Sequence, residues 1–409
     1  MNFNDLDLSE KIIRSLKDQN YIKPTPIQAE VIPAILNNSD VMASAQTGTG
    51  KTAAFVLPIL SKLSHPKNND KGHQLRALIL TPTRELAAQV RENVNTYSKY
   101  LNIRSTAVYG GARIHNQKLK LRKGIDILVA TPGRLLDLYN QKSVNFKNIE
   151  ILVLDEADQM LDMGFIHDIK KIIKLLPERR QNLMFSATFS NSFRSLALSV
   201  ADKAIEISVT SDNETGHNIE HYVHPVDKSR KTELLIELIQ KEKWEQALVF
   251  TRTKHGADRL KKGLDKVNIK ALAIHGNKTQ NNRMKALEAF KKNKINILVA
   301  TDVAARGIDI KNMSQVINFD LPTVAKDYIH RIGRTGRAGE KGKAISLVSA
   351  DEFNYLQDIE KILNHKLERV EINGFEPVHA LPLKHKTPKR NIIIKVDTEK
   401  ENGTGKDSS

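Results

Sequence analysis

The chain has 409 residues, of which 40% are hydrophobic, and a formal net charge of +17. This length exceeds one ordinary hydrophobic core and predicts two domains of conventional size. Cysteine is absent, which excludes disulfides and thiolate metal sites and favours a reducing compartment. No apolar run reaches the roughly 18 residues of a membrane span, and the first residues do not form a signal peptide. We therefore expect a soluble, cytoplasmic protein without membrane contact.

The positive charge is divided evenly along the chain. Residues 1–210 contain 28 Lys and Arg against 20 Asp and Glu, and residues 211–370 contain 29 against 21. Residues 371–409 contain 7 against 6. The charge thus belongs to the body of the protein and not to a basic tail. A polyanion held between two lobes fits this division, and a generally basic protein is the alternative.

A phosphate-binding loop is predicted near the N-terminus. Residues 1–36 read as helical with a turn at 23–26, and a strand near 41–43 leads into the motif at 45–52. Glycines in such a loop let backbone N–H groups close around phosphate oxygens, and the next helix adds its positive end. Lys51 is then expected to reach the β- and γ-phosphates and Thr52 to ligate Mg²⁺. The motif begins with Ala45 where the general pattern has glycine, so it is a weak signal alone.

An acidic segment follows the apolar residues 151–154. Four apolar residues in a row predict a strand covered on both faces, as in a parallel sheet. Asp155, Glu156 and Asp158 follow at the end of this strand, where ligands bind in open α/β sheets. Close carboxylates repel unless a cation lies among them, so we expect a divalent metal site, with a solvated acidic turn as the alternative. Together with the upstream loop, the segment predicts nucleotide hydrolysis.

Three further apolar runs, at 77–80, 127–130 and 183–185, deliver hydroxyl, glycine and arginine groups to the same edge. Such groups suit phosphate contacts, although each run could also end in an ordinary turn. The residues concerned are Pro82, Thr83, Arg84, Thr131, Gly133, Arg134, Ser186 and Thr188, together with Gly111 in a turn at 109–111.

The second half of the chain repeats the first at a lag of 170 residues. Residues 77–84 align with 247–254, and residues 128–131 align with 298–301. Two matches at one lag predict a duplicated α/β domain. The second copy has no phosphate loop, so we expect only the first half of the chain to bind the nucleotide.

The second half contains two arginine-bearing segments, at 300–309 and 330–337. Arg331, Arg334 and Arg337 are three residues apart among glycines, close enough to meet one triphosphate. A guanidinium suits the charge that develops on a γ-phosphate. A basic loop that binds RNA phosphates is the alternative.

Taken together, these residues resemble the DEAD-box ATP-dependent RNA helicases of superfamily 2. The resemblance covers nearly all of residues 1–370 in the family's order, residues 155–158 spell its name, and the nearest subgroup is the bacterial RhlE type. It implies an α/β fold of two tandem RecA-like domains, each a parallel sheet flanked by helices. We expect these domains at 1–209 and 220–370, a linker at 210–219, and a largely disordered tail at 371–409. A monomer is expected.

The resemblance also implies roles in ATP hydrolysis. Gln28 would read the adenine edge, Tyr21 would stack on the ring and Asp309 would bond the ribose. Asp155 would hold Mg²⁺ with Thr52, and Glu156 would activate the attacking water. The implied catalytic residues are Lys51, Asp155, Glu156, Arg334 and Arg337. The implied nucleotide-binding residues are Phe3, Tyr21, Gln28, Gln46, Thr47, Gly48, Thr49, Gly50, Lys51, Thr52 and Asp309.

Roles toward RNA follow from the same resemblance. The implied RNA-binding residues are Pro82, Thr83, Arg84, Gly111, Thr131, Gly133, Arg134, Arg252, Gly276, Gln280, Arg283 and Thr301. The residues implied to couple the domains are Asp158, Ser186, Thr188, Asp302, Arg306 and His330.

The implied activity is hydrolysis of ATP to ADP and phosphate, coupled to RNA binding and to local unwinding of short duplexes or remodelling of RNA–protein complexes. An ATP-gated RNA clamp or annealing scaffold carries the same motifs, and a DNA-translocating motor is a third reading. In the tail, residues 381–390 are a weak RNA-binding candidate and residues 391–396 could add a strand.

Overall fold

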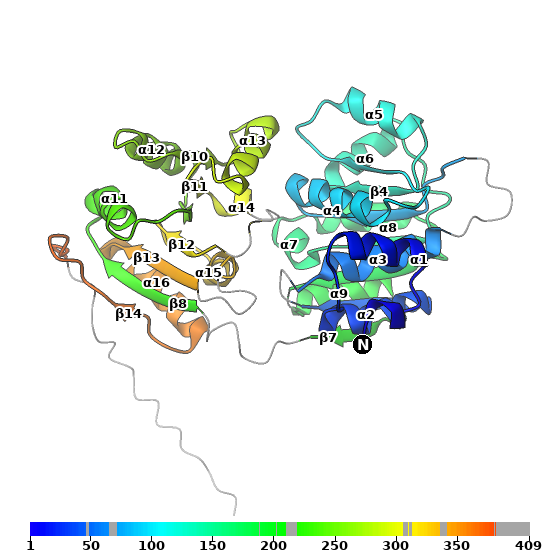
Figure 1. Cartoon of the computed structure of the whole chain (residues 1–409), viewed down its shortest axis with the longest axis horizontal. Coiled ribbons are helices and arrows are strands. Elements are labelled where there is room, and N and C mark those ends of the chain that lie inside the picture. Colours follow the sequence, from blue (N-terminus) through cyan, green and yellow to red (C-terminus); the bar gives the residue numbers. More distant parts are fainter. Residues whose placement is uncertain are drawn as a thin grey trace, which may run out of the picture.

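The computed structural model describes residues 1–45, 49–64, 72–187, 189–201, 203–209, 219–305, 310, 313–335, 342–379 and 381. It contains two seven-stranded sheets, each with its own helices, which form two lobes side by side in Figure 1. Within this part of the chain, no helix is both long and apolar enough to cross a membrane. The predicted cytoplasmic location stays a prediction.

The first lobe holds a parallel sheet in the order β3-β4-β2-β5-β6-β1-β7. Its strands are β1 Val41–Ser44, β2 Ala77–Leu80, β3 Ser105–Val108, β4 Ile127–Ala130, β5 Ile151–Leu154, β6 Gln181–Ser186 and β7 Ile205–Ser208. Its helices are η1 Phe3–Asp5, α1 Glu10–Asp18, α2 Pro26–Leu36, α3 Lys51–Leu63, α4 Arg84–Tyr97, α5 Ile114–Arg122, α6 Pro132–Asn140, α7 Ala157–Asp162, α8 Ile166–Leu175 and α9 Asn191–Val200.

The second lobe holds a parallel sheet in the order β10-β11-β9-β12-β13-β8-β14. Its strands are β8 Ile219–Pro225, β9 Ala247–Phe250, β10 Ala271–Ile274, β11 Ile297–Ala300, β12 Gln315–Asn318, β13 Gly342–Val348 and β14 Glu368–Arg369. Its helices are η2 Lys228–Arg230, α11 Lys231–Lys241, α12 Lys254–Asp265, α13 Gln280–Lys291, α14 Asp302–Ala305, α15 Ala325–Ile332, η3 Ala350–Glu352 and α16 Phe353–Leu363.

The two sheets have the same topology, as the sequence repeat predicts. Shifting each strand number by seven converts one strand order into the other. The match extends to single hydrogen bonds: the backbone N–H of Thr81 donates to Ala130 at 2.9 Å, and that of Thr251 donates to Ala300 at 2.9 Å. These residues are 170 positions apart, so the predicted duplication is confirmed.

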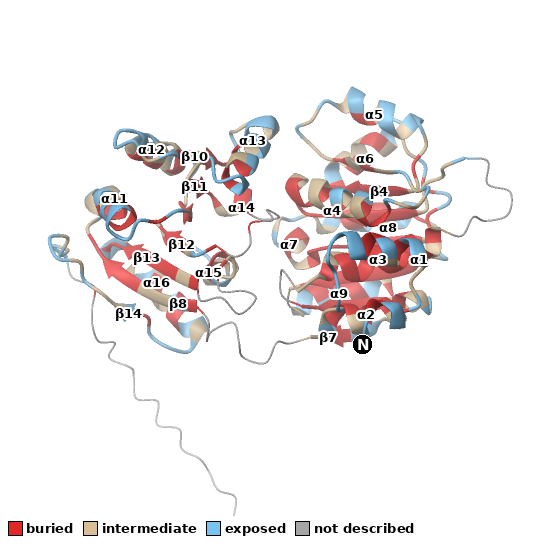
Figure 2. Cartoon of the chain, in the orientation of Figure 1, coloured by how far each residue is buried: buried red, intermediate tan, exposed pale blue. Residues whose placement is uncertain are grey.

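Both faces of each sheet are covered, which explains why the strands are apolar throughout. In β5, Ile151 and Val153 pack into one core cluster, and Leu152 and Leu154 pack into the cluster on the opposite face. Figure 2 shows the buried residues concentrated along the strands and the inner faces of the helices. Successive side chains of a strand point to opposite faces, so a strand between two helical layers must be apolar at every position.

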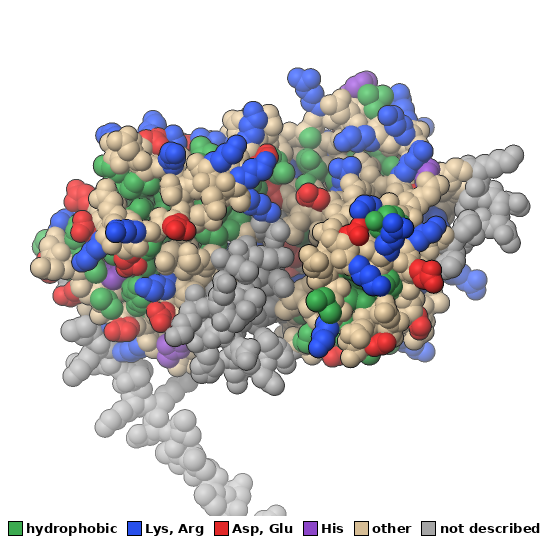
Figure 3. Space-filling view, in the orientation of Figure 1, with side chains coloured by type: hydrophobic (Ala, Val, Ile, Leu, Met, Phe, Trp, Pro, Cys, Tyr) green, Lys and Arg blue, Asp and Glu red, His purple; other side chains and the backbone are tan. Residues whose placement is uncertain are grey.

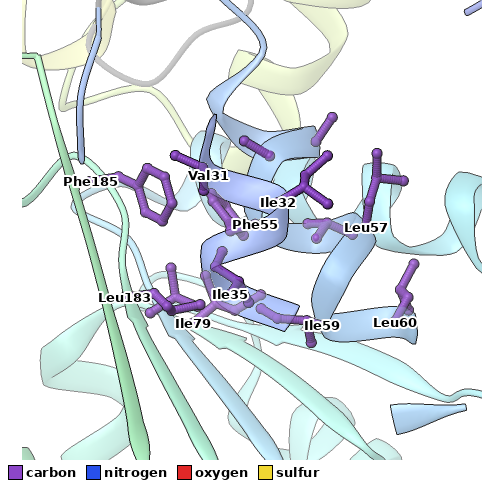
Figure 4. Close-up of a cluster of buried hydrophobic side chains, with 14 of the residues drawn as sticks. Val31, Ile32, Ile35, Phe55, Leu57, Ile59, Leu60, Ile79, Leu183 and Phe185 are labelled. Atoms are coloured by element: carbon purple, nitrogen blue, oxygen red, sulfur yellow. The ribbon is translucent and has the colours of Figure 1, made fainter. Parts of the chain in front are cut away.

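One of these clusters joins the helices that precede and follow β1. Figure 4 shows side chains of α2 and α3 packed on the sheet. Phe55 and Phe185 are fully buried, with ring centroids 5.0 Å apart. The residues labelled there are Val31, Ile32, Ile35, Phe55, Leu57, Ile59, Leu60, Ile79, Leu183 and Phe185.

The structure corrects the expected ends of the second lobe. Ile219, expected in the linker, is the first residue of β8. Residues 371–379 belong to the lobe and not to a loose tail, because Ile372 and Phe375 pack against its core. Leu381 is buried as well. The two segments of the tail that the sequence suggested for RNA binding and for an extra strand, residues 381–390 and 391–396, lie outside the described residues apart from Leu381.

Leu183→Ala and Leu198→Ala form a matched pair that tests the packing of the first lobe. Leu183 is fully buried, whereas Leu198 on α9 is 64% exposed. Leu183→Ala should lower the free energy of unfolding by about 2–5 kcal/mol because it leaves a cavity, and Leu198→Ala should change it by less than about 0.5 kcal/mol. Urea titration followed by circular dichroism measures both values, and equal effects would contradict this assignment of the core.

Candidate functional site

Lys51 is held at the carboxyl ends of two strands of the first sheet. It opens α3, is 7% exposed, and donates through Nζ to the carbonyl oxygens of Ala45 at 2.6 Å and Ser186 at 3.1 Å. The ammonium group is thereby desolvated and fixed beside the end of β1. Of the predicted loop residues, Gln46, Thr47 and Gly48 lie outside the described part, whereas Thr49, Gly50 and Thr52 adjoin Lys51.

Gln28 connects α2 to this loop. Its side chain is buried, donates through Nε2 to the carbonyl of Gly50 at 3.1 Å, and accepts the backbone N–H of Thr25 at 3.0 Å. Gly50 has φ +94°, and a Cβ added there would lie 2.3 Å from Gln28 Nε2. Only glycine meets both conditions, because the left-handed backbone and the close approach each exclude a side chain.

The other two residues expected near the adenine differ in exposure. Tyr21 is 42% exposed, and its hydroxyl lies 3.5 Å from that of Tyr97. Phe3 is 4% exposed and packs in the core of the first lobe. The ring of Phe3 is therefore covered by its own lobe, and only Tyr21 presents an aromatic surface to a ligand.

Asp155 and Glu156 follow β5 and face the same region. Asp155 is 3% exposed, and burial together with the negative charge of Glu156 raises the pKa of Asp155 to about 7, against the opposing effect of Lys51. Glu156 has φ +52°, a strained conformation for a residue with a side chain. A cation would relieve the repulsion between the two carboxylates.

The acidic segment is also tied to the end of β6. Asp158 accepts the backbone N–H of Ala187 at 3.0 Å through Oδ2 and that of Gln159 at 3.0 Å through Oδ1. Ser186 is fully buried, and its carbonyl contacts Lys51. The ends of β1, β5 and β6 therefore form one connected group. Thr188 lies outside the described residues.

Three of the predicted RNA-binding residues of the first lobe meet at one place. Gly111 has φ +74°, and a Cβ added there would lie 1.9 Å from Nη1 of Arg84. Arg134 donates to the carbonyl of Ala112 at 3.1 Å, and Gln117 bonds both backbone groups of Tyr109 at 3.1 Å. The turn is therefore fixed against Arg84, Arg134 and α5.

The remaining residues of this set lie at the same edge. Thr83 caps α4 by accepting the backbone N–H of Leu86 at 3.3 Å, and Thr131 precedes α6. Pro82 adjoins Thr83, and a side chain at Gly133 would meet nothing within 4 Å. The space at Gly133 leaves the edge open to a ligand.

In the second lobe, Arg252 is engaged within its own lobe. Its guanidinium donates to the carbonyl of Leu321 at 3.2 Å and to Oε1 of Glu352 at 2.6 Å, and it lies over the ring of Tyr355 at 4.9 Å. Gly276 follows β10 and is exposed, whereas Thr301 follows β11 and is 8% exposed.

A buried acid of the first lobe contacts the second lobe directly. Glu85 on α4 accepts a hydrogen bond from Nε2 of Gln280 at 2.9 Å and pairs with Nη2 of Arg283 at 3.0 Å. Its side chain is only 5% exposed. Both partners lie on α13, which faces the first lobe in Figure 1. Glu85 directly follows Arg84 in the sequence, but nothing in the sequence indicates its two partners.

Arg331, which the sequence groups with Arg334 and Arg337 as able to meet a triphosphate, is instead buried and bonded within the second lobe. It is 2% exposed and forms a two-pronged ion pair with Asp302 at 2.6 and 2.7 Å. It also donates to Asn318 at 3.0 Å and to the carbonyl of Asp320 at 2.7 Å. Arg331 therefore joins the ends of β11 and β12. The repeated arginines at 330–337 predict a functional segment, but they do not indicate which arginine is buried.

Arg334 and His330 line a narrow cavity at the junction of the lobes. This cavity, of about 20 Å³, is also lined by Gln159 from α7 of the first lobe and by Asp302. The segment after β5 and the arginine segment of the second lobe are thus brought together. Arg306, Asp309 and Arg337 lie outside the described residues.

Asp155→Asn should reveal the cost of burying this acid. A folded-state pKa raised from 3.8 to about 7 means that the ligand-free fold loses stability as pH rises between these values and no further above them. The substitution should therefore stabilise the protein at pH 8, by on the order of 4 kcal/mol at most, and have little effect at pH 4. Thermal unfolding at both pH values measures this. Asp162→Asn, which alters an exposed carboxyl of α7, is the control, and a pH-independent effect of Asp155→Asn would refute the burial cost.

Glu85→Ala should separate the lobes. The substitution leaves Arg283 partly buried without its partner, which typically costs about 2–5 kcal/mol. Small-angle X-ray scattering should then give a larger radius of gyration. Glu92→Ala, on the exposed side of the same helix, should leave the radius unchanged. An unaltered radius for Glu85→Ala would show that other contacts hold the lobes.

Comparisons with known proteins identify relatives of both lobes. A family described as DEAD/DEAH box helicase matches residues 25–196, and one described as helicase conserved C-terminal domain matches residues 230–339. The DEAD-box ATP-dependent RNA helicase RhpA of Helicobacter pylori is 42% identical over 370 residues, or 90% of this chain and 74% of the relative. CshA of Bacillus cereus, of the same description, is 42% identical over 369 residues, or 90% and 69%.

Solved structures show the same architecture. S. cerevisiae Dbp5 bound to RNA and ADP BeF3 has a TM-score of 0.80 and 32% identity, covering 90% of this chain and 95% of that one. Mss116p bound to single-stranded RNA and AMP-PNP has a TM-score of 0.81 and 29% identity, covering 90% and 78%.

Proposed function

The chain belongs to the DEAD-box family of ATP-dependent RNA helicases, and we propose that it hydrolyses ATP between its lobes while holding RNA across both of them. The observation that carries this proposal is the meeting of Lys51, Asp155 and Glu156 at one edge, with Arg334 beside the helix that follows them. ATP is the substrate, and local separation of short RNA duplexes is the expected outcome. The RhlE-type subgroup stays a prediction.

ATP is proposed to bind at the end of β1. The ammonium of Lys51 already lies desolvated at this position and would exchange its two carbonyl partners for the β- and γ-phosphates. Thr49 and Gly50 precede α3, whose positive N-terminal end favours phosphate. Gln28 is proposed to bond the adenine edge while fixing Gly50, and Tyr21 to stack on the ring. Gln46, Thr47, Gly48 and Asp309 complete the proposed set from outside the described residues.

The donor set after β5 fits Mg²⁺. Mg²⁺ is commonly held by one or two carboxylates plus substrate phosphates, and no cluster of three or more acidic or histidine ligands occurs in the described part of the chain. Asp155 and the hydroxyl of Thr52 would hold the ion. When bound, it would neutralise charge on the β- and γ-phosphates. The raised pKa of Asp155 supports this choice, because burial and the charge of Glu156 disfavour its carboxylate and a bound cation would offset both.

Glu156 is proposed to position and activate the attacking water. Its strained backbone, with φ +52°, fixes the side chain at the turn between β5 and α7. Glu156 lies next to Asp155, so water and γ-phosphate would meet in one place. Because a general base contributes typically about 10²–10⁴-fold, loss of this carboxylate should lower the rate by about that factor.

The second lobe is proposed to complete the site. Arg334 and Arg337 would stabilise charge on the γ-phosphate, and Arg331 would hold their segment through Asp302. The cavity shared by Arg334 and Gln159 supports this approach of the lobes. Further residues proposed to couple the lobes are Asp158, Ser186, Thr188, Arg306 and His330.

RNA is proposed to lie across both lobes, at Arg84, Gly111 and Arg134 in the first and at Gln280 and Arg283 in the second. Backbone groups, glycines and arginines suit phosphates and 2′-hydroxyls, so binding should be largely independent of sequence. RNA that bridges the lobes and ATP that needs both would each favour closure, so each should tighten the other. The further proposed contacts are Pro82, Thr83, Thr131, Gly133, Arg252, Gly276 and Thr301.

Glu156→Gln and Lys51→Ala test the chemical roles. Glu156→Gln should lower RNA-stimulated ATP turnover at least about 100-fold, because the general base is lost, yet retain ATP-dependent RNA binding. Lys51→Ala should lower both, because the phosphate contact is lost. Phosphate release and fluorescence anisotropy measure the two quantities. Turnover by Glu156→Gln at the wild-type rate would refute its role as base.

A further inference from the structure

The stretch around α5 carries positive charge without any negative charge. Residues 93–125 contain seven Lys and Arg and no Asp or Glu. Four of these side chains are exposed on α5 and its two ends: Arg113, Lys120, Arg122 and Lys123, here called the basic face. Figure 2 shows α5 as mostly exposed, and Figure 3 shows Lys and Arg side chains gathered over it.

The charges of the basic face are not neutralised within the described parts of the chain. None of its four side chains forms an ion pair or hydrogen bond with another described residue. In the same stretch, by contrast, Lys99 pairs with Asp18 at 2.6 Å. The contrast is sharper in α13, which occupies the same place in the second lobe, because Lys292 there pairs with Glu288 at 2.6 Å.

The basic face forms a continuous row. Arg113, Lys120 and Lys123 are spaced by seven and three residues, which places them on one side of the helix and makes them the row, whereas Arg122 projects from another side. At a rise of 1.5 Å per residue, the row extends for about 15 Å. That length accommodates several phosphates of one nucleic-acid strand.

The row begins at the proposed RNA edge. Gln117 in α5 bonds both backbone groups of Tyr109, which precedes Gly111, and Arg134 bonds Ala112. The turn that carries Gly111 is therefore fixed to the N-terminal end of α5. A strand leaving this edge would meet Arg113 first and then the rest of the row.

We propose that the basic face binds the phosphate backbone of single-stranded RNA that continues past the carboxyl edge of the first sheet. This inference rests on the proposed function and extends its RNA site. Helix α5 contains no Phe, Tyr or Trp, so the proposed contact depends mainly on charge. Longer RNA should therefore bind more tightly than RNA that fills only the proposed edge.

The test replaces Lys120 and Lys123 with Gln in the full chain and measures the affinity of two oligouridylates at several salt concentrations. One RNA of about 8 nucleotides fits a single binding site, and one of about 24 extends beyond it. For the long RNA, the slope of log affinity against log salt should fall by about 1.4, because two phosphate contacts of about 0.7 each are lost. For the short RNA, the slope should not change. The control replaces Lys170 and Lys174, two exposed lysines of α8, with Gln and should match wild type.

Three outcomes would overturn the inference. They are an unchanged slope for the long RNA, an equal fall for the short RNA, and an equal fall in the α8 control, which would report net charge only. A wild-type chain that binds neither RNA would overturn the proposed function together with this inference. Tight binding of the long RNA with an unchanged slope would overturn this inference alone.

Discussion

Parallel strands place their carboxyl ends along one edge of a sheet, and the candidate site depends on this constraint. Lys51, Asp155 and Ser186 lie far apart in sequence, yet they follow β1, β5 and β6, which are neighbours in the first sheet. Apolar packing on both faces fixes these strands, so the charged residues at their ends are held in place by the core. The buried charges of the site are tolerated because the surrounding packing compensates for their cost.

The second sheet repeats this constraint without repeating the nucleotide site. Its strand order is the same, but its edge carries Arg331, Asp302 and Arg334 in place of a phosphate loop. Two copies of one architecture thus supply different halves of a single centre. The contact of Glu85 with Gln280 and Arg283 holds the two edges together. Because these three residues lie at the proposed RNA path, a ligand at this junction would act directly on the arrangement of the lobes.

The sequence predicts more of the sheets than of the contacts between them. Apolar runs and a repeat at 170 residues correctly indicate the strands and the duplication, because burial on both faces leaves a local pattern. Arg84, Gly111 and Arg134 are found together because each follows a neighbouring strand. The partners of Glu85 could not be predicted, since they belong to the other lobe. The burial of Phe3, Arg331 and Leu381 depends on packing between distant segments, and the surrounding residues give no local sign of it.

The central claim is that the catalytic centre is divided between the lobes and completed only when RNA and ATP are both bound. A structure of the chain with a non-hydrolysable ATP analogue and an oligoribonucleotide tests it most directly. The account predicts the guanidinium of Arg334 at the γ-phosphate, opposite Lys51, with RNA contacting both lobes. An Arg334 side chain directed away from the γ-phosphate in that complex would contradict the account.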